Sequence, residues 1–434
     1  MRLTRRFFLR STGALAVYCG VNPLDAALAA SMDDPAEHPT ARRKTLVVVF
    51  LRGGIDGLNL VVPHGDPHYA KLRPGIGVPT PGKEGGALDL DGFFGLNPRA
   101  AALLPAFGSG AAVALQAVGY PGNSRSHFEE QDVWETGVSG NTVGHDGWLN
   151  RHLLTSTGHG PIRAVALSDT LPRILQGEAP AYAFPGLTDL GFSSNRGGRG
   201  GPGGDGEASV VAALEHAHAA LDPGAAGDAL GLVHAAGRDT LEGVRVLRGV
   251  AARPYERAAR YPDGQLGARL ASAARLIKAG VGLEVVQIDY GGWDTHNRQG
   301  AGAQGVFGGK VAELSGGLAA FLEDLGPRAE DTLVLTLSDF GRTAKQNGTG
   351  GTDHGWANAV LALGGPVAAQ AAGRRGPVLG AWPGLGPGQL NQGRDLRHTT
   401  DFRDVLAEAV VSHLGNANLP KVLPGHAFSR AGLL

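Results

Sequence analysis

The sequence predicts a doubly wound α/β fold, in which a mostly parallel central sheet carries helices on both faces. Short, unbroken apolar runs of strand length recur along the 434 residues. Segments with helical periodicity lie between these runs, so that strands and helices alternate along the chain. Unbroken rather than alternating apolarity is typical of strands that are covered on both faces, as in a parallel sheet.

The individual elements follow from the same patterns. Strands are expected at Thr45–Leu51, Ala111–Val118, Ile162–Leu167, Leu283–Asp289, Thr332–Leu337 and Ala359–Leu363. Helices are expected at Pro98–Phe107, Leu266–Ala279, Lys310–Leu325 and Asp401–Leu414. The third helix places Val311, Leu314 and Leu318 on one face, as in a helix that packs against a sheet. Gly415 is expected to end the fourth helix.

Residues 43–434 are expected to form a single domain, with a glycine-rich loop and a helical insertion at about 193–261. The loop, Ser193–Glu207, resembles no phosphate-binding loop, because no strand precedes it and no Gly-Lys-Ser/Thr ends it. The alanine-rich stretch that follows, Glu207–Tyr261, is expected to be helical and to cover the sheet as a cap or side layer.

Residues 1–30 have the pattern of a twin-arginine export signal. Arg5 and Arg6 precede a modestly apolar stretch, which closes with the small-x-small cleavage pattern at Ala27-Leu28-Ala29. Pro23 and Asp25 interrupt the apolar run, which is too short to span a bilayer. A transmembrane span is not expected in the mature chain either. The export machinery is the expected partner of this segment, and the expected location is the periplasm or the cell exterior.

The composition narrows the classes of function. The formal net charge is −1, from 39 basic and 40 acidic residues, which gives no indication of nucleic-acid binding. The single cysteine, Cys19, lies inside the export signal. The mature protein is therefore expected to have no disulfide, no thiolate metal site and no cysteine nucleophile.

Acidic residues and histidines gather at the expected strand ends, where ligands bind in a doubly wound sheet. The residues concerned are Asp56, Asp294, His296, Asp339, Asp353 and His354. Carboxylates crowded at one edge would repel one another unless a cation neutralises them. Aspartate and histidine without sulfur suit one or two divalent cations, with Zn²⁺, Mn²⁺, Mg²⁺ and Ca²⁺ all open. Taken singly, each of these residues is also explained as a helix cap, a turn residue or an ordinary histidine.

A second candidate group follows the strand Ala111–Val118. Ser126 precedes a helical stretch, where it fits either an N-cap with Glu129 completing a capping box or a nucleophile at a helix N-terminus. In the second interpretation Arg125 is a candidate clamp for an oxyanion and His127 a candidate acid or base. Ser124 is a lesser candidate for the nucleophile.

The chain resembles a group of twin-arginine exported bacterial proteins known as domain-of-unknown-function family 1501, which has no settled activity. The resemblance is carried, in order, by "FLRGGIDGLNLVVPHGD", "RSHFEEQDVWETG", "DGWLNRHL", "GGWDTHNRQ", "LSDFGRTAKQN" and "GTDHGWANAVLALGG". These motifs span nearly the whole mature chain. The family in turn resembles the alkaline phosphatase and sulfatase superfamily. Its members are doubly wound α/β proteins with paired metals and a Ser, Thr or modified Cys nucleophile at a helix N-terminus.

That resemblance implies roles for individual residues. Asp56 matches the ligand after the first strand, Ser126 stands where the nucleophile would be, and Asp294 with His296 resembles the Asp/His pair of the middle strand. Asp339 resembles the aspartate of an Asp-His dipeptide, and His354 the last histidine ligand.

The sequence also departs from the superfamily pattern. Phe340 stands where a histidine is expected, the Asp294–His296 spacing is two residues rather than four, and Asp353 is an additional carboxylate. No Cys-x-Pro-x-Arg segment is present, so ordinary sulfatase chemistry is not expected.

Two functions remain open from the sequence. The first is an exported, metal-dependent hydrolase of phosphate or sulfate esters, which acts on a small-molecule or polymer ester by in-line displacement at a metal-activated serine or water. The alternative is a non-catalytic metal-binding or assembly protein that keeps the alkaline phosphatase-like fold.

Overall fold

The computed structural model describes residues 43–139, 146–158, 160–187, 229–302, 304–374 and 376–434. The expected export signal and the glycine-rich loop lie outside the described residues. Within the described residues, no helix combines the length and the apolarity that are needed to cross a membrane.

A nine-stranded sheet forms the centre of the fold, in the order β11-β5-β10-β9-β1-β8-β6-β7, with β12 also pairing with β5. Its strands are β1 (Thr45–Leu51), β5 (Ala112–Gly119), β6 (Ala164–Leu167), β7 (Tyr182–Ala183), β8 (Val285–Tyr290), β9 (Thr332–Leu337), β10 (Asn358–Gly364), β11 (Val378–Leu379) and β12 (Thr400–Asp401). A small second sheet has the order β2-β4-β3. It contains β2 (Val61–Val62), β3 (Leu88–Asp89) and β4 (Gly95–Leu96).

The direction of β10 sets the shape of the edge at which ligands would bind. The central strand β1 runs parallel to β8 and β9, and β8 runs parallel to β6. In contrast, β10 is antiparallel to both of its neighbours, with Ala362 opposite Leu335 and Leu361 opposite Ala114. The start of β10 therefore lies at the same edge of the sheet as the carboxyl ends of β1, β8 and β9.

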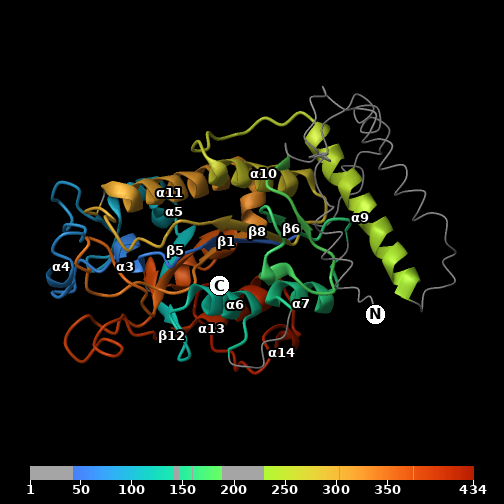
Figure 1. The fold of residues 1–434 in the computed structure, drawn as a ribbon. Coiled ribbons are helices and arrows are strands. Elements are labelled where there is room, and N and C mark those ends of the chain that lie inside the picture. Colours follow the sequence, from blue (N-terminus) through green and yellow to red (C-terminus); the bar gives the residue numbers. More distant parts are fainter. Residues whose placement is uncertain (1–42, 140–145, 159, 188–228, 303, 375) are drawn as a thin grey trace, which may run out of the picture.

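Helices cover both faces of the sheet (Figure 1). One face carries α5 (Leu104–Gly108), α10 (Gln265–Ala279) and α11 (Gly305–Leu325), and the other carries α6 (His127–Thr136), α7 (Trp148–Thr155), α13 (Phe402–Glu408) and α14 (Leu419–Val422). Alternate residues of β1 enter the two cores: Val47 packs in the cluster of Leu270, and Val48 in the cluster of Phe402. The predicted doubly wound, mostly parallel α/β class is confirmed.

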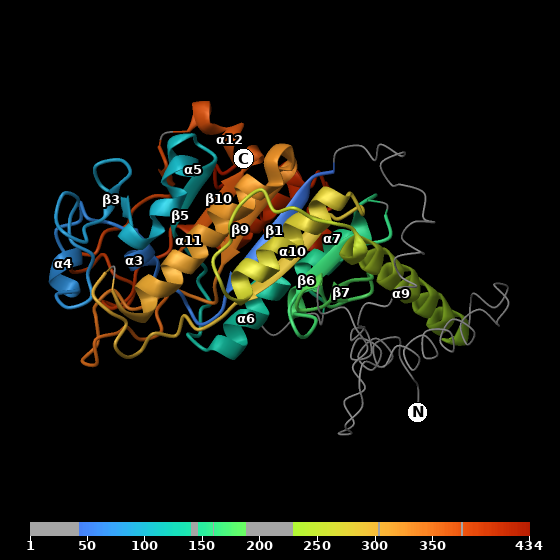
Figure 2. The same ribbon diagram turned by 90° about the horizontal axis from the view of Figure 1, so that it is seen from above.

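The remaining elements are short, apart from one long helix. The short elements are α3 (Gly57–Leu60), α4 (Tyr69–Leu72), α12 (Gly365–Ala368) and the 3₁₀ helices η2 (Pro98–Leu103), η3 (Arg173–Leu175), η6 (Gly326–Asp331) and η7 (Ala371–Gly373). The long helix is α9 (Ala229–Ala252), which lies beyond β7 at one end of the sheet (Figure 2). Its Leu247 and Val250 are buried in the same core as α10.

Two expected helices are divided in the structure. The helix expected at Pro98–Phe107 is a 3₁₀ helix as far as Leu103 and then α5, with a break in helical geometry at Ala100. Pro105 has no N–H to donate, so no regular hydrogen bond can run from it back into the preceding turn. The helix expected at Asp401–Leu414 is α13 followed by a π-helical turn, η8 (Ala409–His413). The apolar periodicity of that segment gives no sign of the widened turn.

His413, in that turn, makes the stability of the fold depend on pH. Its Nε2–H donates to the carbonyl of Thr45 at 3.0 Å, and burial lowers the pKa of the ring to about 4. An unfolded histidine has a pKa near 6.5, so between about pH 6.5 and 4 only the unfolded chain takes up this proton. We expect the free energy of unfolding to fall by about 3 kcal/mol as the pH is lowered through that window.

Urea denaturation at several pH values checks this expectation, with His413→Gln as the test variant. Glutamine keeps an amide N–H for the Thr45 carbonyl but does not titrate, so the variant should lose less stability between pH 6.5 and 4. Equal pH dependence in the two proteins would show that another group is responsible.

Candidate metal centre

The carboxyl edge of the sheet brings together most of the residues that the sequence singled out. Asp294 and His296 follow β8, Asp339 follows β9, and His354 precedes the antiparallel β10. His127 is the first residue of α6 and is reached from β5 through a short loop. Four segments of the chain therefore supply polar side chains to one place.

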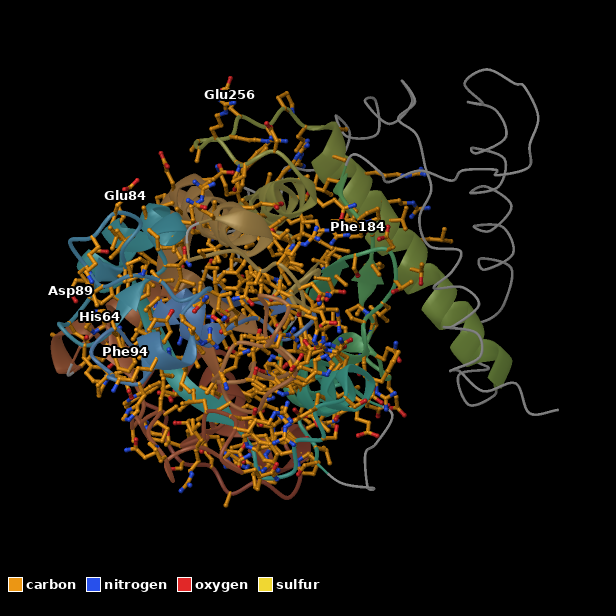
Figure 3. All side chains as sticks on the ribbon, turned by 60° about the vertical axis from the view of Figure 1, so that its left-hand side comes forward. His64, Glu84, Asp89, Phe94, Phe184 and Glu256 are labelled. Atoms are coloured by element: carbon orange, nitrogen blue, oxygen red, sulfur yellow. The ribbon has the colours of Figure 1, made fainter. Side chains whose placement is uncertain are left out.

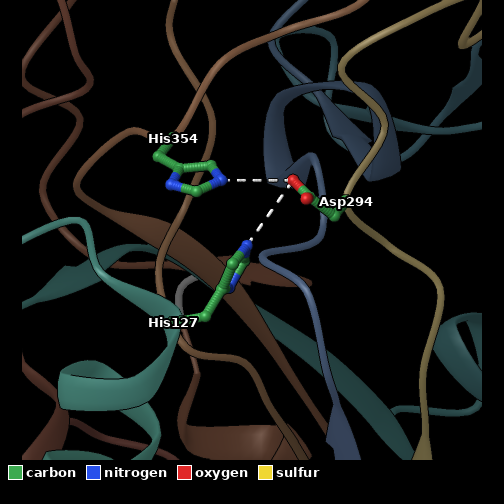
Figure 4. A group of neighbouring side chains, drawn as sticks. All are labelled: His127, Asp294 and His354. Carbon is green, nitrogen blue, oxygen red and sulfur yellow. Dashed lines mark hydrogen bonds and ion pairs between the residues drawn. The ribbon is translucent and has the colours of Figure 1, made fainter.

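His127, Asp294 and His354 form the centre of this group (Figure 4). One ligand atom from each lies within 4.8 Å of the corresponding atoms of the other two. Oδ1 of Asp294 lies 3.5 Å from Nε2 of His127 and 3.3 Å from Nε2 of His354. His296 joins from the side, with its Nε2 3.0 Å from Asp294 Oδ1 and 3.0 Å from His354 Nε2.

Each of the three imidazoles is oriented through its other nitrogen. Nδ1 of His127 bonds to Asp339 Oδ2 at 2.6 Å, Nδ1 of His296 to Asp353 Oδ1 at 3.0 Å, and Nδ1 of His354 to the carbonyl of Arg125 at 2.8 Å. Carboxylates and carbonyls only accept hydrogen bonds, so all three Nδ1 atoms carry the hydrogen. The three rings therefore turn their Nε2 atoms toward Asp294. A proton or a cation must lie among these atoms, because their lone pairs repel one another.

Asp339 is buried and accepts hydrogen bonds on both oxygens. Oδ1 accepts from the backbone N–H groups of Gly53 at 3.0 Å and Gly54 at 3.3 Å, and Oδ2 accepts from His127 and from Gln131 at 2.9 Å. Burial alone would raise the pKa of Asp339, but these donors outweigh it and hold the pKa below its usual value. The Asp339 hydrogen bond in turn raises the pKa of His127. This pair has the arrangement in which a carboxylate orients a histidine ligand from behind.

The glycines after β1 allow this close approach. Gly53 has a φ of 112°, and a Cβ there would lie 2.7 Å from the backbone nitrogen of Asp294. A Cβ on Gly54, with a φ of 65°, would lie 2.7 Å from the ring of Phe340. Side chains at these positions would push apart the segments that carry Asp294 and Asp339.

A buried arginine neutralises Asp294. The side chain of Arg342 is 0% exposed and its Nη1 lies 2.7 Å from Asp294 Oδ1. Burial opposes ionisation of Asp294, but the hydrogen bond and the charge of Arg342 outweigh it and lower the pKa. Arg342 itself is fixed by Thr352, through Oγ1 at 3.2 Å and the carbonyl at 2.8 Å.

Asp353 has the most exposed side chain of the site, and His296 lies beside it. Their side chains are 53% and 37% exposed. Hydrogen bonds from Asn347 and then His296 lower the pKa of Asp353. Asp353 thus contacts the cluster through His296.

The loop before α6 is arranged differently from either interpretation of the sequence. Ser126 is the N-cap residue, but its side chain makes no capping bond, and Glu130 rather than Glu129 reaches back, to the N–H of Ser124 at 2.6 Å. Within the described residues, the Ser126 hydroxyl has no hydrogen-bond partner. Ser124 is occupied, because its Oγ donates to Glu130 at 2.9 Å.

Arg125 supports His354 through its backbone, and its guanidinium is bound elsewhere. Its φ of 60° is unusual for a residue other than glycine, and its carbonyl accepts from His354. The guanidinium bonds to Asp395 at 2.6 Å and to Gln392 at 2.8 Å, and it lies over the ring of Trp356. The structure therefore does not show it as a free clamp for an oxyanion.

Asp56 lies apart from these contacts in a separate buried pair. It is 0% exposed, and its Oδ2 accepts from Arg73 and from Gln299, both at 2.6 Å. Phe340 is also 0% exposed, and its ring stacks on His127 with the centroids 4.7 Å apart.

Several residues that support the site were not identified from the sequence. Gln131, Thr352 and the Arg125 carbonyl act only as second partners of other residues. Gln131 was detectable in principle, because it lies four residues after His127 and hence on the same face of a helix. The Arg342–Asp294 pair joins segments 48 residues apart and needed the tertiary structure.

Part of the chain matches a known family model. Residues 240–414 match the family model described as "Protein of unknown function (DUF1501)". No curated protein matches the sequence. Among solved structures, the chain is similar to the crystal structure of PsFucS1 sulfatase from Pseudoalteromonas sp., with 14% sequence identity and a TM-score of 0.28. That similarity covers 92% of this chain and 73% of the sulfatase chain.

Proposed function

Since this chain belongs to the DUF1501 family of proteins of unknown function, we propose from its site that it is a metal-dependent hydrolase of phosphate or sulfate esters. The observation that carries the proposal is the convergence of three Nε2 atoms on the Asp294 carboxylate, with each Nδ1 already bound. Nε2 of His127 is buried and has no hydrogen-bond partner among the described residues. An unpaired buried acceptor that faces a carboxylate fits a cation between them.

The donor atoms also narrow the identity of the cation. His127, His296 and His354 offer nitrogen, Asp294 offers oxygen, and sulfur is absent. Imidazole nitrogen suits Zn²⁺ and related transition metals better than Ca²⁺ or Mg²⁺, which prefer oxygen. Zn²⁺ is therefore the first candidate and Mn²⁺ the second. When bound, such a cation would polarise an ester oxygen and lower the pKa of a water or of a serine hydroxyl.

The surrounding residues have roles that suit this chemistry. The first N–H groups of α6 have no acceptor within the helix and favour an anionic group at its N-terminus. Ser126 lies at that terminus with an uncommitted hydroxyl, so it is the candidate nucleophile, and a water molecule is the alternative. The net reaction is hydrolysis: the hydroxyl of water ends on phosphorus or sulfur, and its proton ends on the leaving alcohol.

A non-catalytic metal-binding or assembly role remains the second candidate, and one observation favours it. The two arginines nearest to the candidate serine and to Asp294 already bind carboxylates: Arg125 binds Asp395, and Arg342 binds Asp294. Neither is free to neutralise the oxygens of a substrate in this arrangement. A hydrolase would need the cation and the helix N-terminus to supply most of that charge stabilisation.

The decisive experiment measures metal content and turnover together. The purified mature protein is analysed for bound metal and assayed on p-nitrophenyl phosphate, bis-p-nitrophenyl phosphate and p-nitrophenyl sulfate with Zn²⁺ or Mn²⁺ added. We expect ester hydrolysis that falls by about 100-fold or more in Ser126→Ala if the serine is the nucleophile. Ser109→Ala, an exposed serine outside the site, is the matched control.

The outcomes separate the candidates. Loss of turnover in Ser126→Ala with metal retained supports the serine, and full turnover in that variant supports water. Metal without hydrolysis of any ester supports the binding role. A protein that binds neither metal would refute both proposals.

We also propose that the protein is exported through the twin-arginine pathway and acts outside the cytoplasm. The support is the sequence of residues 1–30 alone. Cell fractionation tests it, and recovery of the uncleaved chain from the cytoplasm of a strain with an intact pathway would contradict it.

A further inference from the structure

We propose that the candidate metal centre holds one divalent cation. In this proposal Asp56 is not a metal ligand, because its carboxylate binds the buried side chain of Arg73 and stabilises the fold. This inference rests on the proposed metal site and concerns the number of cations. Acidic residues from several strand ends would also suit two cations, and the sequence alone does not decide between one and two. The contacts of Asp56 and of Phe340 favour one.

Asp56 already has a cationic partner. Nη1 of Arg73 lies 2.6 Å from its Oδ2, and the two side chains are 0% and 1% exposed. The other donors of Arg73 are also committed: Nε bonds to the carbonyl of Ala344 at 2.9 Å and Nη2 to that of Thr343 at 2.8 Å. A guanidinium bound on three sides is held in place and supplies the positive charge that a cation would otherwise supply to Asp56.

A hydrogen-bonded chain connects this pair to the candidate centre. Gln299 donates to Asp56, and its Oε1 accepts from Thr352 at 3.2 Å. Thr352 in turn binds Arg342, which contacts Asp294. The two Asp–Arg pairs are thus parts of one rigid support, but they differ in what else they face. Asp294 is 43% exposed on its side chain and faces three imidazoles. Asp56 is buried, its Oδ2 contacts Arg73 and Gln299, and its Oδ1 has no hydrogen-bond partner among the described residues.

Phe340 occupies the space beside the histidines on the strand β9 side. Its buried ring stacks on His127 and lies 4.9 Å from the ring of His354, centroid to centroid. It packs against Gly54, two residues before Asp56. A phenylalanine offers no ligand atom, so this residue supplies none beside the histidines.

The test is the metal stoichiometry of the full mature chain. The protein is loaded with Zn²⁺ alone and, separately, with Mn²⁺ alone, freed of excess metal and measured by inductively coupled plasma mass spectrometry. We expect one cation per chain in the wild type and in Asp56→Asn, and a loss of at least ten-fold in metal affinity in Asp294→Asn. Thermal denaturation should show a lower Tm for Asp56→Asn, because Arg73 loses its counter-charge.

Two cations per wild-type chain would overturn this inference while leaving the proposed function in place. No cation in the wild type would instead refute the proposed function. If Asp56→Asn does not fold, the titration stoichiometry of the wild type, measured by calorimetry with Zn²⁺, still distinguishes one cation from two.

Discussion

Replacing Asp339 by asparagine is expected to weaken Zn²⁺ binding by about 10- to 100-fold. The oxygen of the new amide can still accept from Gly53 and Gly54, which leaves its NH₂ group facing His127 Nδ1. Nδ1 would then have to be the acceptor, and the ring hydrogen would move to Nε2. An Nε2–H cannot bind a cation. The substitution would therefore remove His127 as a ligand, although His127 itself is unchanged.

Competition with a chromophoric chelator at fixed pH measures this affinity. The matched control is Asp89→Asn, which changes another aspartate that contacts a histidine, His64, at 3.1 Å and at the edge of the molecule (Figure 3). We expect the control to bind Zn²⁺ like the wild type. Wild-type affinity in Asp339→Asn would disprove the tautomer explanation and the ligand role of His127.

Replacing Arg73 by methionine is expected to lower the free energy of unfolding by about 3–5 kcal/mol. Methionine fills much of the volume of the arginine stem, but it leaves the buried Asp56 carboxylate without its counter-charge. It also leaves the Thr343 and Ala344 carbonyls without their donors. Burial makes an unpaired charge costly, whereas an exposed arginine contributes little.

Guanidinium chloride denaturation of three proteins tests this expectation. Arg257→Met changes an exposed arginine and should stay within about 0.5 kcal/mol of the wild type. The double variant Arg73→Met/Asp56→Leu removes both charges and should recover part of the loss, because the uncompensated carboxylate is gone. If Arg73→Met is as stable as the wild type, the pair is not the structural support that we describe.

The strands were predictable because a strand that is covered on both faces appears in the sequence as an unbroken apolar run of neighbouring residues. Thr45–Leu51 and Thr332–Leu337 have the observed bounds of β1 and β9, since every residue in these runs is buried. The apolar pattern was not sufficient to predict the type of helical turn. Apolar periodicity in Asp401–Leu414 is the same for an α-helical and a π-helical turn, so the division into α13 and η8 could not be inferred.

The candidate site was predictable as a set of residues but not as an arrangement. His354 precedes its strand and Asp294 follows its own, and they meet only because β10 runs against β9. His127 was expected as an acid or base and is placed among the metal-ligand candidates. Asp56, expected as a ligand, contacts Arg73, whose role nothing near it in the sequence indicates.

The sequence by itself determined which segments become strands and helices, and hence that acidic residues and histidines gather at strand ends. Local apolarity and periodicity contain this information, because burial of a strand or of a helix face is a property of neighbouring residues. Only the tertiary structure decided which charged or polar group lies next to each of these residues. Whether a carboxylate faces an imidazole, as Asp294 does, or a guanidinium, as Asp56 does, depends on residues brought from distant parts of the chain. Electrostatic energy depends on distance in space, and no sequence pattern records it.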